Sequence, residues 1–103
     1  MDEPVKFDSG KPAFELMSPH AMFGLARVLA FGAQKYGARN WEMGLKNSRI
    51  FAAAMRHLWA WWLGEDLDKE TGLSHLHHAA ACVMMLQHNV EARHHDVDDR
   101  PVL

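Results

Sequence analysis

Apolar residues recur every three or four positions in three stretches of this sequence, which is the spacing of one face of an α-helix. No stretch alternates apolar and polar residues in the way that predicts a half-buried β-strand. We therefore predict an all-α fold, a compact bundle of three to four helices. A chain of 103 residues can form one domain but buries its surface incompletely, so we also expect it to form oligomers, a dimer or larger.

The first helix is predicted over residues 19–36. Ser18 can accept a backbone hydrogen bond at its start, and Pro19 has the fixed φ that suits the first helical position. Gly37 favours an end directly after residue 36. The residues before this helix, 1–17, contain prolines and glycines without periodicity and are expected to form an irregular arm.

Two further helices follow. The second is predicted to be capped by residue 47 or 48 and to run to about residue 63, where Gly64 interrupts it. The third is predicted to be capped by Thr71 or Ser74 and to run to about Glu91, and residues 95–103 form a polar tail. The residues predicted to face inward are Met22, Leu25, Val28, Leu29 and Ala33 in the first helix, Ile50, Ala54, Leu58 and Trp61 in the second, and Leu76, Ala80, Val83, Leu86 and Val90 in the third.

Charge and composition limit the partners. The formal charge of −2 provides no basic field for nucleic acid, so no nucleic acid is expected as a partner. The lone Cys82 fits a reducing compartment, and no apolar run approaches the roughly 18 residues needed to span a bilayer. We predict a cytoplasmic protein that binds no membrane. Tryptophans at 59, 61 and 62 exceed what one helix face can bury, so at least one is expected to contact another subunit.

The stretch GEDLDKETGLSHLHH, residues 64–78, gathers carboxylates and histidines. If the second helix continues past Gly64, Glu65 and Asp68 share one face and could bind a hard cation such as Mg²⁺ or Mn²⁺. His75 and His78 share one face of the third helix, where they could bind a metal or hold water and phosphate. Antiparallel packing of the two helices would bring these four residues into one metal site.

The alternative is a solvated acidic loop followed by one core histidine and other solvated histidines. Four residues of the stretch are expected to be solvated in either case: Asp66, Lys69, Glu70 and His77. His57 is predicted to stand apart from the metal set, because eight residues of continuous helix separate it from Glu65 by about 12 Å. With Arg56 it could instead meet a phosphate, a second ion or a carboxylate, or both could have purely structural roles.

A second group of polar and aromatic residues lies around the end of the first helix. Lys35 and Arg39 offer positive charge to a phosphate, Asn40 offers a donor and an acceptor to a base edge, and Tyr36 and Trp41 offer stacking surfaces. These residues indicate a possible nucleotide pocket. The alternative is a helix end with solvated cations and a tryptophan that plugs the core.

Three segments of the chain, KFDSGKPAFELMSP, VLAFGAQKYGARNW and RHLWAWWLGEDLDKETGLSHLHHAA, resemble a family of small phage and prophage domains, the N-terminal domain of dATP/dGTP diphosphohydrolase. The resemblance covers nearly the whole chain, from Lys6 to about Leu86. It implies a role in phage nucleotide metabolism in the host cytoplasm, as a relative of the all-α nucleotide pyrophosphohydrolases similar to MazG.

The resemblance also implies a reaction: hydrolysis of a purine deoxynucleoside triphosphate to its monophosphate and pyrophosphate, with a divalent metal, Mg²⁺ or Mn²⁺. Glu65 and Asp68 look like one E-x-x-D pair of that class, and the first helix carries no carboxylate for a second pair. The implied sites are catalytic Glu65, Asp68 and His57; substrate-binding Lys35, Tyr36, Asn40, Trp41 and Arg56; and metal-binding Glu65, Asp68, His75 and His78. The alternatives are a protein that binds or sequesters a nucleotide without turnover, and a helical interaction module.

Overall fold

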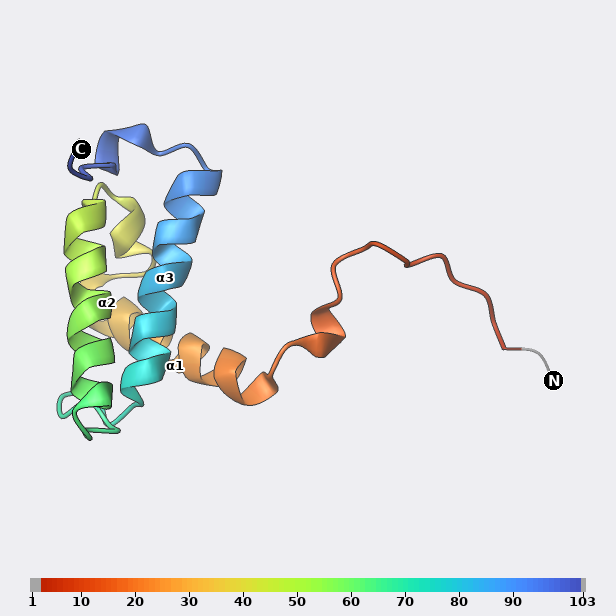
Figure 1. Ribbon diagram of the computed structural model, residues 1–103, viewed down its shortest axis with the longest axis horizontal. Coiled ribbons are helices and arrows are strands. Elements are labelled where there is room, and N and C mark those ends of the chain that lie inside the picture. The colour runs from red at the N-terminus through yellow and green to blue at the C-terminus, as the bar shows by residue number, and fades with distance from the viewer. Residues whose placement is uncertain (1–2, 103) are drawn as a thin grey trace.

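The computed structural model describes residues 3–102 and is built from three α-helices (Figure 1). The α-helices are α1 (Pro19–Tyr36), α2 (Asn47–Trp62) and α3 (His75–Glu91), and the short 3-10 helices are η1 (Phe14–Leu16), η2 (Asn40–Glu42) and η3 (His95–Val97). Residues 3–102 contain no β-strand, only an isolated bridge between Leu67 and Ser74. The all-α prediction is confirmed, with three α-helices in this part of the chain.

Helices α2 and α3 form an antiparallel hairpin, and α1 packs against α3 (Figure 1). Two helix starts were predicted correctly, because Ser18 Oγ accepts from Ala21 N at 3.2 Å and Ser74 Oγ accepts from Leu76 N at 3.1 Å. The predicted cap of α2 was wrong, since Lys46 is the flanking residue and Asn47 is the first helical residue. No helix in the range 3–102 is both long enough and apolar enough to cross a membrane.

The core lies between α2 and α3. Ile50 and Ala54 are buried as predicted, but Leu58 and Trp61 are each 38% exposed. In α3 the predicted stripe was wrong: Leu76, Ala80, Val83 and Val90 are exposed and Leu86 is half-buried. The buried residues of α3 are His75, Ala79, Ala81 and Asn89. In α1, Met22 is exposed and the other predicted residues, Leu25, Val28, Leu29 and Ala33, are half-buried.

The crossing of α1 over α3 depends on Gly24, which is buried. A Cβ atom at this position would lie 2.2 Å from Nε2 of His77, so only glycine leaves room for that ring without displacing it. His77 is therefore half-buried against α1, and the prediction that it is solvated was wrong.

The two ends of the described chain differ. Residues 3–17 extend away from the helices, and their apolar side chains are exposed, for example Phe7 at 85% (Figure 1). Residues 95–102 instead fold back beside the start of α2, where Ser48 N donates to Asp99 Oδ1 at 2.8 Å. Val97 is 4% exposed, so the predicted polar tail contributes to the core. Residues 1, 2 and 103 of the predicted arm and tail lie outside the described residues.

A buried amide pair joins α2 to α3. Asn89 Nδ2 donates to Asn47 Oδ1 at 2.8 Å, and the two residues are 3% and 8% exposed. We expect the Asn89→Leu variant to lose about 1–3 kcal/mol of unfolding free energy, because the Asn47 carbonyl is left buried without its donor. Urea unfolding followed by circular dichroism measures this loss. Gln87→Leu, an exposed position of the same helix, is the control, and an equal loss in both variants would contradict the role of the pair.

Candidate functional site

The segment between α2 and α3 turns back on itself and does not continue α2. The helix ends at Trp62, and Gly64 has φ 102°, in the left-handed region that favours glycine. Asp68 N then donates to Leu73 O at 2.8 Å, and His75 N donates to Asp66 O at 3.0 Å. The predicted helical pair of Glu65 and Asp68 was therefore wrong, and Asp68 instead returns toward the last turns of α2.

This return brings His57, Asp68 and His75 together. One potential ligand atom from each lies within 4.8 Å of the other two. The Nδ1 atoms of His57 and His75 are 2.8 Å apart. The prediction that distance keeps His57 out of the metal set was wrong, because it assumed a continuous helix between His57 and Glu65.

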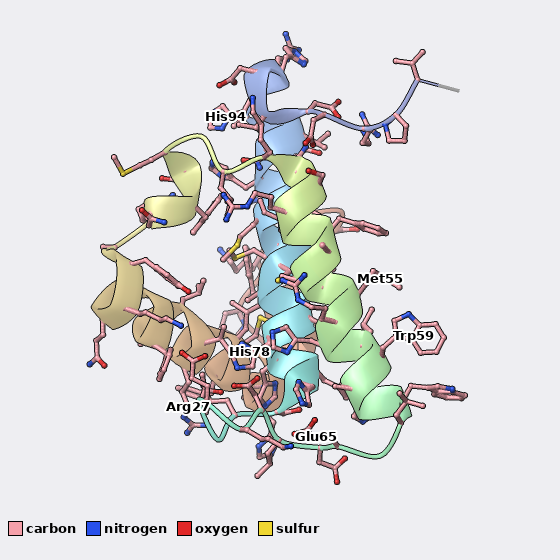
Figure 2. The ribbon with its side chains drawn as sticks, turned by 90° about the vertical axis from the view of Figure 1, so that its left-hand side faces the viewer. Arg27, Met55, Trp59, Glu65, His78 and His94 are labelled. Atoms are coloured by element: carbon pink, nitrogen blue, oxygen red, sulfur yellow. The ribbon has the colours of Figure 1, made fainter. Side chains whose placement is uncertain are left out.

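His78 and Thr71 border this cluster. The His78 ring stacks on the His57 ring at 4.4 Å between centroids with an interplanar angle of 9°, and Figure 2 shows His78 directed toward the space between the helices. Thr71 donates to Asp68 Oδ2 from its backbone N at 2.9 Å and from its hydroxyl at 3.2 Å. Thr71 Oγ1 is also 2.7 Å from His78 Nε2. Thr71 thereby links the carboxylate to the histidine.

The protonation states of these groups follow from their surroundings. Burial raises the pKa of Asp68, but hydrogen bonds from Thr71 and the nearby rings of His78 and His57 outweigh it, so the pKa lies below its ordinary value. Burial lowers the pKa of His57 and of His78, which makes both rings neutral at pH 7. Thr71 has one hydroxyl hydrogen; when Asp68 accepts it, His78 donates to Thr71 Oγ1 from Nε2, which leaves its Nδ1 free to accept.

Glu65 lies on the other side of His75. Its Oε2 atom is 3.5 Å from His75 Nε2, and His75 is 5% exposed. His75 Nε2 has no hydrogen-bond partner among the described residues. Glu65 is labelled in the loop below the helices in Figure 2. A buried ring nitrogen without a partner is costly, which is typical of a site that binds something.

A cavity of about 1240 Å³ opens beside the cluster, between α1, η2, α2 and α3. Three of the clustered histidine and aspartate residues line it: His57, Asp68 and His78. All five residues predicted to bind substrate line it as well: Lys35, Tyr36, Asn40, Trp41 and Arg56. The structure thus brings the predicted substrate residues to one cavity with two of the four predicted metal residues, Asp68 and His78, whereas Glu65 and His75 do not line it. Their individual roles stay predictions.

The sequence analysis missed Arg49, which lines the cavity from the same face of α2 as Arg56. The two arginines are seven residues apart, about 10 Å along a helix, with the small Ala52 and Ala53 between them. Neither arginine makes an ion pair with a described residue. The helical spacing of two arginines around two alanines was the signal that could have indicated Arg49.

The other cations of the cavity are paired. Lys35 Nζ lies 2.5 Å from Glu70 Oε1, so Glu70, although exposed as predicted, is fixed to α1. Arg39 pairs with Glu42, and Glu42 also lies 3.2 Å from His88 Nε2.

The Trp41 ring is held at the far end of the cavity. Its edge meets His88 with ring centroids 5.0 Å apart at 89°. The contacts between η2 and α3 thus fix an aromatic surface opposite the histidine and aspartate cluster.

Comparison with known proteins gives a family and one curated relative. Residues 2–100 match the family described as "dATP/dGTP diphosphohydrolase, N-terminal". A protein of Salmonella phage PMBT28 named "dATP/dGTP diphosphohydrolase" is 45% identical over 82 residues, which are 80% of this chain and 28% of the relative. The chain thus matches little more than a quarter of that relative's length. No solved structure matches this chain.

Proposed function

Because the chain belongs to the family of dATP/dGTP diphosphohydrolase N-terminal domains, we propose that it hydrolyses a purine deoxynucleoside triphosphate to the monophosphate and pyrophosphate. One observation carries the proposal: a single cavity is lined by residues of a histidine and aspartate cluster, by two arginines that make no ion pair with a described residue, and by the half-buried Trp41. These are the groups that a nucleoside triphosphate requires, namely a cation site, phosphate donors and a base platform.

The cluster end of the cavity suits a divalent cation. Asp68 is ionised, His57 is neutral, and one possible ligand atom from each of His57, Asp68 and His75 lies within 4.8 Å of the others, so these residues fit a bound metal. A divalent ion bound there would neutralise phosphate charge and lower the pKa of a bound water. In the tautomer that donates to Thr71 from Nε2, His78 has its Nδ1 available to take a proton from water at the edge of the cluster.

The remaining lining positions the nucleotide. Arg56 is adjacent to His57 and can bind the phosphates nearest the cluster, and Lys35 can add charge from α1. Trp41 and Asn40 can stack on and hydrogen bond to the base, and Tyr36 lies beside Lys35 on the same wall.

A second candidate is a nucleotide-binding protein without turnover. The observation that favours it is the absence of any carboxylate on α1, where the related class carries an acidic pair. In that case the cavity would bind and sequester the nucleotide, and the cluster would hold its phosphates without activating water.

Turnover separates the two candidates. We expect purified protein, incubated with dATP or dGTP and Mg²⁺ or Mn²⁺, to release equal amounts of monophosphate and pyrophosphate, measured by ion-pair chromatography. dCTP and dTTP are the controls for base selection. Saturable binding of a purine nucleotide without product would exclude hydrolysis and support the second candidate, nucleotide binding without turnover. The absence of both binding and product would exclude both candidates.

We also infer that the chain forms a dimer through the outer side of α2. Phe51, Trp59 and Trp62 are 57%, 57% and 71% exposed there, and Met55 and Trp59 point away from the other helices (Figure 2). Such a contiguous apolar surface is typical of a protein interface.

A further inference from the structure

The close approach of two imidazole nitrogens is the most unusual contact in the cluster. The Nδ1 atoms of His57 and His75 face each other at 2.8 Å, and an imidazole in its neutral form carries one ring hydrogen. Without an ion, one Nδ1 must donate to the other. If His57 donates, His75 keeps its hydrogen on Nε2, beside the carboxylate of Glu65; if His75 donates, its bare Nε2 faces that carboxylate at 3.5 Å, with no hydrogen between two acceptors.

A cation bound by both Nδ1 atoms excludes the second of these arrangements. Both rings then carry their hydrogen on Nε2, and the nearest carboxylate oxygen to the His75 Nε2 is Glu65 Oε2 at 3.5 Å, which a small movement of the exposed end of Glu65 would bring to hydrogen-bond distance. Histidines that bind metals commonly donate their second N–H to a carboxylate, which fixes the ring and its tautomer. This arrangement gives Glu65 a different role from that of a ligand.

The separation also fits metal coordination. Two nitrogens that are each about 2.1 Å from one ion, at right angles, are about 3.0 Å apart. The observed 2.8 Å is close to this value, and an atom of Asp68 lies within 4.8 Å of both histidines. Two imidazoles and one carboxylate leave open positions for water or substrate oxygen.

The chemistry of these ligands selects the ion. Mg²⁺ prefers oxygen ligands, keeps several waters and is bound in proteins mainly through carboxylates and phosphates. Imidazole nitrogen is instead a ligand for first-row transition metals. The cluster has only one carboxylate and two imidazoles, so it gives Mg²⁺ little advantage over the water oxygens of its hydration shell.

We propose that His57, His75 and Asp68 bind a transition-metal ion such as Mn²⁺, Co²⁺ or Zn²⁺ in preference to Mg²⁺, and that Glu65 orients His75 by accepting its Nε2–H. The inference rests on the proposed function and specifies the cofactor of the same site.

Metal binding by the full chain, stripped with chelator, tests the preference. Isothermal titration with Mn²⁺, Co²⁺, Zn²⁺ and Mg²⁺ should give an affinity for Co²⁺ or Zn²⁺ at least about 100-fold above that for Mg²⁺. The visible spectrum of bound Co²⁺ should show d–d bands, and electron spin echo modulation of bound Mn²⁺ should show ¹⁴N couplings. Equal affinity for Mg²⁺ and Co²⁺, or bound Mn²⁺ without ¹⁴N coupling, would overturn the inference.

Variants test the role of each residue. Asp68→Asn and His57→Gln should lose the Co²⁺ spectrum, whereas Glu65→Gln should keep it with affinity reduced by about 10- to 100-fold. His95→Gln, at an exposed position outside the cluster, is the control and should bind as the unchanged protein does. Circular dichroism of each variant establishes that it is folded. Complete loss of Co²⁺ in Glu65→Gln would show that Glu65 is a ligand after all.

The same measurements separate this inference from the proposed function. Transition-metal binding without nucleotide hydrolysis would leave the metal site in place and remove the hydrolase. Hydrolysis supported by Mg²⁺, with no binding of Co²⁺ or Zn²⁺, would leave the hydrolase and overturn the metal assignment.

Discussion

The Asp68→Asn variant is expected to lose nucleotide hydrolysis, with kcat lowered by about 10²- to 10³-fold or more. Asp68 is the only carboxylate of the three-residue cluster, and its depressed pKa keeps it ionised at neutral pH. Asparagine has nearly the same shape and can still accept from Thr71, so the loop keeps its hydrogen bonds while the charge is removed. The release of pyrophosphate under saturating dGTP or dATP, compared with the unchanged protein, measures the effect.

Asp66→Asn provides the matched control for this prediction. Asp66 precedes Asp68 by two residues in the same loop, but its side chain is exposed and does not line the cavity. We expect this variant to keep kcat, since only the backbone oxygen of Asp66 holds His75. A loss in Asp66→Asn equal to that in Asp68→Asn would attribute the effect to the loop as a whole. Full activity in a folded Asp68→Asn variant would remove Asp68 from the reaction.

Both boundaries of α1 and the start of α3 could be predicted because the signals that set them are local. Ser18 and Ser74 each accept a backbone hydrogen bond within three residues, and Gly37 directly follows α1. Each of these contacts is present in the sequence as a short spacing.

The face that α3 turns inward could not be predicted in the same way. Apolar periodicity indicated Leu76, Val83 and Val90, yet the helix buries His75 and Asn89. Asn89 is satisfied by Asn47, a residue 42 positions away, and the Nδ1 atom of His75 contacts His57, 18 positions away. Polar residues can be buried when partners from another element are in place, and the sequence alone does not show those partners.

The candidate site shows the same limit. Lys35, Asn40, Trp41 and Arg56 were recognised by residue type, and the cavity gathers them. The membership of His57 depended on the loop reversing direction after Gly64, which a distance counted along one helix does not include. Residue chemistry therefore indicated the kind of site, and the tertiary path of one loop decided its composition.

The proposed dimer follows from surfaces that the hairpin leaves uncovered. A stripe of apolar residues runs along α2 at spacings of three or four residues, with only one step of a single residue: Phe51, Met55, Leu58, Trp59 and Trp62. On α3, Leu76, Val83 and Val90 recur every seven residues and are 40%, 46% and 63% exposed. Such stripes on two adjacent helices are what an antiparallel hairpin needs to pair with a second copy as a four-helix bundle.

The double variant Trp59→Lys, Trp62→Lys is therefore expected to convert the dimer to a monomer. Two tryptophans per copy bury roughly 500 Å² of aromatic surface in a dimer, worth about 12 kcal/mol at about 25 cal/mol per Å². The variant loses this contribution and places four lysine charges in the interface. The remaining contacts then no longer offset an association cost of about 4–15 kcal/mol. Light scattering after gel filtration should give twice the chain mass of 11.7 kDa for the unchanged protein and that mass for the variant. Phe14→Lys, an exposed aromatic position of η1, should stay dimeric, because η1 belongs to the arm that extends away from the helices (Figure 1). A monomer at every concentration of the unchanged protein would contradict the interface.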